Sequence, residues 1–180
     1  MDVLLVIDMQ NAIFAGGIAR FDMEGVIGRI NRLATAVRHY GGRVIFIQHD
    51  GIEAEGLLPQ SSGWQILTAL NVHASDGRLR KTACDAFYRT ELQDILSGVG
   101  LERLIIMGCA SDFCVDTTVR AAASRDFDVV VAADGHSTGD RPHLRAEEII
   151  RHHNWMWENL ILPDHPVRVR TTANLIAAMG

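Results

Sequence analysis

The stretch Val3–Asp8 reads VLLVID, five apolar residues followed by an acidic one. A run without polar alternation is typical of a strand that is buried on both faces of a parallel sheet. An amphipathic segment follows at residues 23–40, where apolar residues recur three and four positions apart, and it predicts a helix. The next apolar run, Arg43–His49, predicts a second strand. A strand, a helix and a strand in this order form the repeating unit of a parallel sheet.

The same alternation continues through the rest of the chain. Further apolar runs predict strands at residues 103–108 and 127–134, and weaker patterns predict strands at residues 79–82 and 167–170. Amphipathic segments predict helices at residues 90–98, at 112–125, at 143–160 just after Pro142, and after Thr172. About six strands alternating with helices predict a doubly wound α/β fold with three layers, in which helices cover both faces of a mostly parallel sheet. Residues 50–78 are the least regular; a short helical pattern lies near residues 64–70, and we expect a lid or a subunit interface there.

The bulk composition limits the function. The 180 residues suffice for a full hydrophobic core, and we expect a single domain over residues 1–180. A net charge of −5 and the lack of a basic run argue against a nucleic-acid partner. No apolar stretch approaches the ~20 residues that cross a bilayer, so we expect no membrane partner. Three cysteines, an odd number without paired spacing, and no visible N-terminal signal favour a reducing, cytoplasmic compartment.

The loops that follow the strands decide the chemistry, because ligands of open α/β sheets bind beyond the carboxyl ends of the strands. These loops lack several common motifs. There is no G-x-G-x-x-G after the first strand, no P-loop, no G-x-S-x-G elbow, no H-E-x-x-H and no C-x-x-C. The sequence therefore argues against a dinucleotide-binding protein, a P-loop NTPase and a serine α/β-hydrolase.

Three strand ends instead carry Asp8, Lys81 and Cys114. Cys114 stands in the first turn of the helix predicted at 112–125, where partial positive charge favours a thiolate and N–H groups can receive an oxyanion. A base, a charge-balancing cation and a nucleophile are the groups that acyl transfer through a thioester needs. Each residue also has a structural interpretation: a turn cap for Asp8, a solvated surface lysine for Lys81 and a packed core thiol for Cys114.

Four segments around these residues resemble the isochorismatase-like cysteine hydrolases, a superfamily that includes nicotinamidases, N-carbamoylsarcosine amidases and isochorismatases. The segments are Val6–Asn11, Lys81–Phe87 with Thr90 and Leu92, Gly108–Val115 and Asp134–Thr138. The second has the pattern K-x5-F-x2-T-x-L and the third the pattern G-x5-C-V. Each segment alone is modestly specific, whereas all four in this order and at these separations are specific. The resemblance covers nearly the whole chain.

The resemblance implies a catalytic triad of Asp8, Lys81 and Cys114 in a hydrolase that cleaves a small-molecule amide or related C–N bond through a thioester. It implies an oxyanion hole formed by the N–H groups of Ala110 and Cys114, with a non-proline cis peptide bond before Ala110. It also implies the strand order 3-2-1-4-5-6 and a homo-oligomer. In this order the sheet reverses between the Asp8 strand and the Cys114 strand, where open α/β sheets bind their ligands.

Two other functions remain open. The isochorismatases of this superfamily cleave a vinyl ether by proton transfer, and Cys114 favours C–N hydrolysis without excluding that reaction. A catalytically idle member would instead bind a ligand or act as a scaffold, although all three triad positions are filled. The D-x-H metal motif that nicotinamidases carry after the second strand is missing from Gln48–Gly51, so we expect no metal and no cofactor.

Candidates for the walls of a substrate pocket lie near the triad in the sequence or follow a strand end. They are Gln10, Phe14, Trp64, Phe87, Phe113 and His136. Core packing is the alternative for the aromatic side chains. We interpret His49 as a hydrogen-bonded residue at the rim of the site. The segment His152–Trp157 lies within the helix predicted at 143–160, and we expect its aromatic side chains to form core or subunit contacts.

Overall fold

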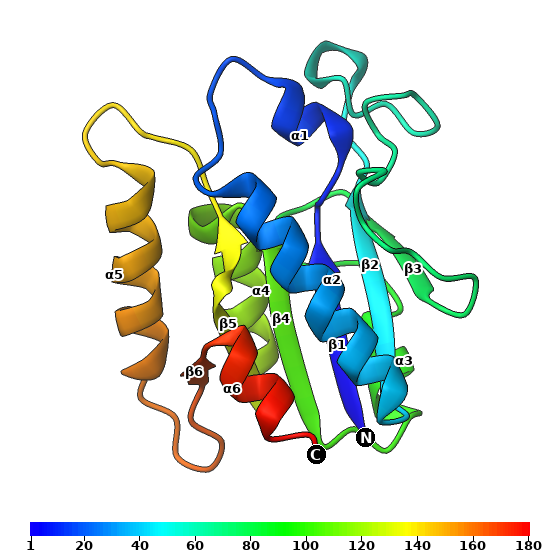
Figure 1. The fold of residues 1–180 in the computed structure, drawn as a ribbon, viewed down its shortest axis with the longest axis vertical. Coiled ribbons are helices and arrows are strands. Elements are labelled where there is room, and N and C mark those ends of the chain that lie inside the picture. The colour runs from blue at the N-terminus through cyan, green and yellow to red at the C-terminus, as the bar shows by residue number, and fades with distance from the viewer.

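Six parallel strands form one sheet in the computed structural model, which describes residues 1–180 (Figure 1). The strands are β1 (Asp2–Ile7), β2 (Arg43–His49), β3 (Gly77–Lys81), β4 (Arg103–Cys109), β5 (Val129–Ser137) and β6 (Arg168–Arg170). They lie in the order β3-β2-β1-β4-β5-β6, and every neighbouring pair is parallel. The doubly wound fold and the order 3-2-1-4-5-6 are therefore confirmed.

Helices cover both faces of this sheet. They are α1 (Asn11–Ala15), α2 (Met23–His39), α3 (Leu92–Ser97), α4 (Asp116–Ala123), α5 (Ala146–Glu158) and α6 (Thr172–Ala177). A 3-10 turn, η1 (Glu53–Glu55), and a π-helical turn, η2 (Ser111–Val115), complete the regular structure. Side chains of α2 and α6 pack on one face, and side chains of α3, α4 and α5 pack on the other.

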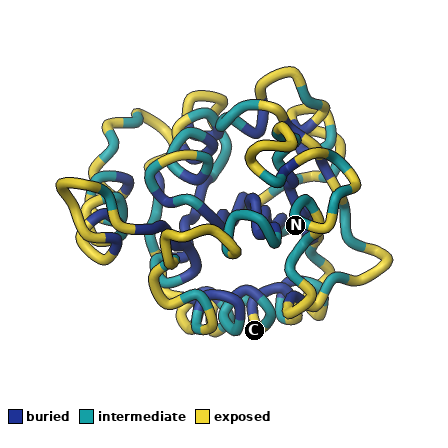
Figure 2. The backbone as a smooth tube through the Cα atoms, turned by 90° about the horizontal axis from the view of Figure 1, so that it is seen from above, coloured by how far each residue is buried: buried dark blue, intermediate teal, exposed yellow.

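Alternate residues of β1 point into two separate cores. Leu4 and Val6 join a core of 18 buried residues beneath α2, whereas Val3, Leu5 and Ile7 join a core of 20 on the opposite face. All five side chains are fully buried, as expected for a strand that is covered on both faces. Burial of each contributes about 1.5–3 kcal/mol, which holds β1 at the centre of the sheet. The exposed residues lie mostly in the peripheral loops (Figure 2).

The short helix predicted near residues 64–70 is absent, so that prediction was wrong. The segment forms turns, and its backbone pairs with the loop that follows β1. Asn11 N–H donates to Gln65 O and Leu67 N–H donates to Met9 O, both at 2.9 Å. A seven-residue helix is marginal without neighbouring turns, so these long-range hydrogen bonds prevail. They fasten the irregular residues 50–76 to the carboxyl end of the sheet.

Two of the predicted helices differ from their sequence patterns at the N-terminal end. α5 begins at Ala146 rather than at residue 143, because Asp140 accepts a hydrogen bond from Ala146 N–H (2.8 Å) and Glu148 accepts one from Arg145 N–H (3.2 Å). The helix predicted at 112–125 divides into η2 and α4. Helix α1 was not expected from the sequence. None of the helices combines the length and the apolar character that crossing a bilayer requires.

The strand order reverses between β1 and β4, and Gly108 makes this junction possible. Its φ angle is +128°, and a Cβ at this position would collide with the backbone of Ile7 on β1. Glycine tolerates such a conformation and leaves room for the neighbouring strand. The loops that leave β1 and β4 therefore start side by side, and they carry Asp8 and Cys114.

Candidate active site

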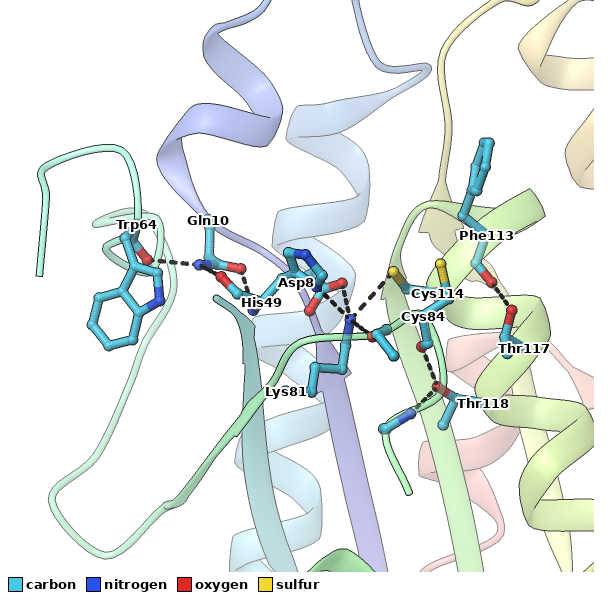
Figure 3. A network of polar contacts seen from close by, with 12 residues as sticks. Asp8, Gln10, His49, Trp64, Lys81, Cys84, Phe113, Cys114, Thr117 and Thr118 are labelled. Carbon is cyan, nitrogen blue, oxygen red and sulfur yellow. Dashed lines mark hydrogen bonds and ion pairs between the residues drawn. The ribbon is translucent and has the colours of Figure 1, made fainter. Parts of the chain in front are cut away.

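Asp8, Lys81 and Cys114 meet at the carboxyl ends of β1, β3 and β4 (Figure 3). The Lys81 ammonium is at the centre of the cluster. Its Nζ atom lies 2.7 Å from Asp8 Oδ2 and 3.3 Å from Cys114 Sγ. The same atom donates to Ala83 O at 3.0 Å and lies 3.4 Å from His49 Nδ1. One cation thus contacts a carboxylate, a thiol and an imidazole at once.

Asp8 is buried at the bottom of the site, with 1% of its surface exposed. It has a left-handed backbone conformation with φ +50°, which is uncommon for a residue with a side chain and is concentrated at functional sites. Oδ2 binds Lys81, whereas Oδ1 is buried without a hydrogen-bond partner. A buried carboxylate oxygen normally has a partner, so Oδ1 is the oxygen of Asp8 with capacity to accept a proton.

Burial and charge act in opposite directions on the acid and the amine. Burial raises the pKa of the Asp8 carboxyl, and the charge of Lys81 opposes this rise without cancelling it. Burial alone would lower the pKa of Lys81, but the charges of Asp8 and Cys114 outweigh it and raise the pKa. Lys81 therefore stays an ammonium, and Asp8 becomes a stronger base than an exposed aspartate.

Cys114 is half-buried in η2, the π-helical turn before α4. Burial and the charge of Asp8 raise the pKa of its thiol, and Lys81 opposes the shift only partly. The expectation that a helix start favours a thiolate here was therefore wrong: the pKa moves the other way. The reason is that burial disfavours the thiolate most, and the negative charge of Asp8 adds to this effect. The thiol keeps its proton until a base removes it.

The turn between β4 and η2 presents backbone N–H groups beside Cys114. The peptide bond between Cys109 and Ala110 is cis, as the resemblance implied. The N–H of Ala110 donates no hydrogen bond within the chain, while its carbonyl accepts from the N–H groups of Phe113 and Val115, both at 3.1 Å. The Ala110 N–H is therefore left to a ligand or water.

A pocket of about 300 Å³ opens above this cluster, at the small end of the range for ligand sites. Asp8 and Cys114 lie among its lining residues. The remaining walls are Ile13, Arg20, His49, Leu57, Cys84, Cys109, Ala110, Phe113 and Arg141. Leu57 comes from the irregular residues 50–76, so this segment contributes one wall of the pocket.

Of the residues expected to line a pocket, Phe113 alone lines this one. Gln10 is buried and ties the loop after β1 to its neighbours through Nε2, which donates to His49 O (3.1 Å) and to Trp64 O (2.9 Å). Phe87 is buried in the core and stacks on Phe127. Because each is held by protein contacts, neither faces the pocket.

Phe14, Trp64 and His136 are also absent from the pocket wall. Phe14 packs against the core beneath α2, because α1 turns it inward. The Trp64 side chain is held by Asp50, to which its Nε1 donates at 2.8 Å. His136 is buried behind the nucleophile turn. The structure thus places Gln10, Phe14, Trp64, Phe87 and His136 outside the wall of this pocket.

His136 instead supports the turn that carries Cys114. Its Nδ1 lies 2.7 Å from Ser111 Oγ in η2, and its Nε2 lies 2.9 Å from Asn154 Oδ1 in α5. Asn154 Nδ2 donates to Ala133 O, which leaves Oδ1 as the acceptor for an Nε2–H and Nδ1 as the acceptor for Ser111. Burial lowers the pKa of His136 to about 4, so this imidazole is neutral. The segment His152–Trp157 therefore reaches the site through Asn154, a link that its helical spacing could not reveal.

His49 lines the pocket and contacts Lys81, which is more than the rim position expected of it. Burial and the charge of Lys81 lower its pKa, so the neutral ring offers Nδ1 as an acceptor to the ammonium. The neighbouring Asp50 is engaged elsewhere, because Arg80 Nε and Trp64 Nε1 both bind its carboxylate at 2.8 Å. No group of three or more His, Cys, Asp or Glu side chains is arranged to hold a metal ion.

Two arginines of the pocket wall were not predicted from the sequence. Arg20 lies in the loop between α1 and α2, and Arg141 lies in the loop between β5 and α5. Arg141 pairs with Asp112 through two hydrogen bonds of 2.7 and 2.9 Å, and its guanidinium lies over the Phe113 ring. Neither loop carries a motif, so no sequence signal marked these residues.

Comparison with known proteins identifies related sequences and a related fold. The isochorismatase domain matches residues 2–154. The chain is 32% identical over 142 residues to streptothricin hydrolase of Streptomyces noursei, covering 79% of this chain and 56% of that protein. It is 30% identical over 181 residues to ureidoacrylate amidohydrolase RutB of Methylorubrum extorquens, covering 79% and 72%. A crystal structure of an isochorismatase family protein superposes with a TM-score of 0.86 at 30% identity, covering 94% of this chain and 98% of that one. The chain spans just over half the length of the streptothricin hydrolases that it matches.

Proposed function

We propose that this chain, which belongs to the isochorismatase family, hydrolyses a small-molecule amide or related C–N bond through a thioester on Cys114. One observation carries the proposal. Lys81 Nζ lies within hydrogen-bond distance of both Asp8 Oδ2 and Cys114 Sγ, and the latter two residues line the same pocket. A base, a cation and a nucleophile that share one pocket are the groups required for this chemistry.

The first step is attack by Cys114. Its thiol holds a proton at rest, because burial and the charge of Asp8 raise its pKa. Asp8 removes this proton as Sγ forms a bond with the carbonyl carbon of the substrate. Lys81 stays protonated between the two, so it balances the charge of the carboxylate and then that of the sulfur as the proton leaves. Once the bond to carbon forms, the negative charge lies on the carbonyl oxygen of the substrate.

The second group of steps breaks the C–N bond and then the thioester. The N–H groups of Ala110 and Cys114 would stabilise the oxyanion, and one such donor is typically worth about 10²–10³ in rate. Asp8 returns its proton to the nitrogen, and the amine departs. Asp8 then takes a proton from water, whose oxygen attacks the thioester carbon. The acid leaves, and the proton returns to Cys114.

The comparisons favour C–N hydrolysis over the other activities considered. One relative is named an amidohydrolase and another a hydrolase of streptothricin. The presence of Cys114 agrees with covalent chemistry, which proton transfer to a vinyl ether does not need. A catalytically idle binding protein does not require a buried base such as Asp8, whose Oδ1 has no hydrogen-bond partner.

Intact-protein mass spectrometry tests the proposal directly. The wild-type protein is mixed with a panel of small primary amides and N-carbamoyl compounds, quenched in acid, and examined for an acyl adduct while released amine is measured. We expect adduct and amine from wild type and from Cys84→Ala, the matched control, because Cys84 is a second thiol of the same pocket. Cys114→Ala should give neither. Amine release by Cys114→Ala at the wild-type rate would overturn the thioester mechanism.

A further inference from the structure

We propose that Arg20 binds a carboxylate of the substrate, so that the preferred substrates are small amides or ureides carrying one negative charge. The inference deepens the proposed function and rests on it for the identity of the bond that is cleaved. The expected preference for a negative charge depends on Arg20 alone, because Arg20 is the charged residue of the pocket wall that has no oppositely charged partner.

Arg20 reaches the pocket with most of its hydrogen-bonding capacity unused. It lines the same cavity as Asp8 and Cys114. Its Nε donates to Ile13 O at 3.0 Å, and this is its one hydrogen bond. No carboxylate lies within 4.0 Å of its guanidinium, in contrast to Arg141, which is paired with Asp112. The two terminal nitrogens of Arg20 therefore remain free to bind a planar anion in the bidentate manner of guanidinium groups.

The other charges of the pocket cancel in pairs. Lys81 neutralises Asp8, with 2.7 Å between Nζ and Oδ2. Arg141 is paired with Asp112, whose pKa is lowered mainly by this arginine and Thr138 despite partial burial. Only Arg20 is left, so the wall carries one net positive charge. A partly desolvated site with one positive charge favours a ligand with one negative charge.

The surroundings hold the Arg20 guanidinium at the pocket. Arg20 forms an isolated antiparallel bridge with Gly139, and a Cβ on Gly139 would lie 2.7 Å from Arg20 Nη1. The bare glycine thus leaves room for the guanidinium. Asp140, which lines a neighbouring pocket with Arg20, accepts from Ala146 N–H at the start of α5 and is committed there. Arg20 also lowers the pKa of the buried Cys109 against the larger effect of burial, so its charge is felt at the residue that precedes Ala110.

The remaining walls indicate what connects the two ends of the substrate. Ile13, Leu57 and Phe113 give the pocket an apolar lining. This lining suits a short hydrocarbon linker between the carboxylate and the carbonyl group that Cys114 attacks. A pocket of about 300 Å³ favours a short substrate, since it is at the small end of the range for ligand sites.

A matched pair of alkylating reagents tests the charge preference without requiring turnover. Iodoacetate and iodoacetamide modify the same sulfur and differ in carrying a carboxylate or a carboxamide. The readout is the ratio of their rates at Cys114, measured by mass spectrometry. A hydrogen bond between charged groups predicts that Arg20→Gln lowers this ratio roughly 10- to 100-fold. Arg151→Gln, which removes an exposed arginine of α5, should leave the ratio unchanged. An unchanged ratio in Arg20→Gln, or an equal loss of both rates, overturns the proposal.

A binding experiment separates this proposal from the proposed function. Succinamate and succinamide both contain a primary amide and differ in one terminal group. Calorimetric titration of Cys114→Ala should show succinamate binding at least about 10-fold more tightly. The preference should disappear in Cys114→Ala/Arg20→Gln and survive in part with Arg20→Lys. Equal affinities, or no binding of succinamate, count against Arg20 even if amides are hydrolysed. Conversely, a clear preference for succinamate in Cys114→Ala, together with no acyl adduct on Cys114 in the wild-type protein, would reject the thioester mechanism and support the anion site.

Discussion

The Lys81 ammonium lies 2.7 Å from Asp8 Oδ2, although 73 residues separate the two in the chain. Both side chains are almost completely removed from water: 0% of the Lys81 side-chain surface and 2% of the Asp8 side-chain surface are exposed. Each charge would be costly to bury alone, and their mutual attraction offsets that cost only while both are present. The pair thus joins β1 and β3 and prepares the base of the site at the same time.

Removing the cation alone should destabilise the fold. We expect Lys81→Met to lower the free energy of unfolding by about 3–5 kcal/mol, because it leaves the Asp8 carboxyl buried without its partner. The double variant Lys81→Met/Asp8→Asn carries no charge at either position and should regain most of this loss. Urea denaturation at pH 7 measures both. A single variant that is as stable as the double variant would contradict this interpretation of the pair.

Removing the carboxylate should have opposite effects on thiol reactivity and on turnover. The charge of Asp8 raises the pKa of Cys114, so Asp8→Asn should lower it and increase the thiolate fraction at neutral pH. Alkylation of Cys114 by iodoacetamide should then become faster, with its pH profile shifted to lower pH. Hydrolysis should fall about 10²–10⁴-fold, because the proton carrier is lost. Lys81→Met is the control of opposite sign: alkylation should slow. Equal shifts in both variants would refute the assignment of charges.

The hydrogen bond between Ser111 and His136 should position the nucleophile turn. Ser111→Ala leaves the buried Nδ1 of His136 without a donor, and we expect a loss of about 1–3 kcal/mol in stability. Because Ser111 lies three residues before Cys114 in η2, kcat should fall more than KM rises. Ser124→Ala, on the exposed end of α4, is the matched control and should change neither. A Ser111→Ala enzyme with wild-type kcat would show that the turn holds itself in place.

Acid should destabilise the protein through His136. Burial lowers its folded-state pKa to about 4 from the ordinary histidine value of 6.5, so below pH 6.5 the unfolded chain takes up the proton first. This contribution to stability is complete above pH 6.5 and is lost as the pH falls toward 4, by about 3 kcal/mol in all. Denaturation curves across this range should be less pH-dependent for His136→Asn than for wild type. The exposed His143→Asn should retain the wild-type dependence, and parallel curves for all three proteins would exclude His136 as the cause.

A side chain at Gly108 should separate β1 from β4. The positive φ and the collision of a Cβ with the Ile7 backbone predict that Gly108→Ala lowers stability by about 3 kcal/mol or prevents folding. Gly16→Ala is the control, since a Cβ added there would have no atom within 4 Å and the φ of Gly16 is −70°. Thermal unfolding distinguishes the two variants. Equal melting temperatures would mean that the strands can move apart at little cost.

The pattern of apolar runs was sufficient to predict the fold. Each strand starts within two residues of its predicted start. The central strands β1, β2, β4 and β5 give the clearest signal, because a strand that is buried on both faces is mostly apolar. The prediction of a short helix near residues 64–70 was wrong, because the conformation of this segment depends on hydrogen bonds to the loop after β1. That loop lies more than 50 residues away in the chain. The predicted start of α5 was wrong for a similar reason. Asp140, which lies before the predicted helix, accepts a hydrogen bond from the first turn of α5.

The sequence by itself determined the alternation of strands and helices, because the period of apolar side chains reflects local structure. The strand order and the place of Lys81 in the site came from the resemblance to a known family. Only the tertiary structure decided how Asp8, Lys81 and Cys114 act on one another. The raised pKa of Cys114 comes from burial and from Asp8 on another strand, whereas its own helix start pointed to a thiolate. Arg20 is unpaired because the loops around it direct their carboxylates elsewhere. Such effects depend on the distances between side chains and on their burial, and neither can be read from the amino-acid sequence.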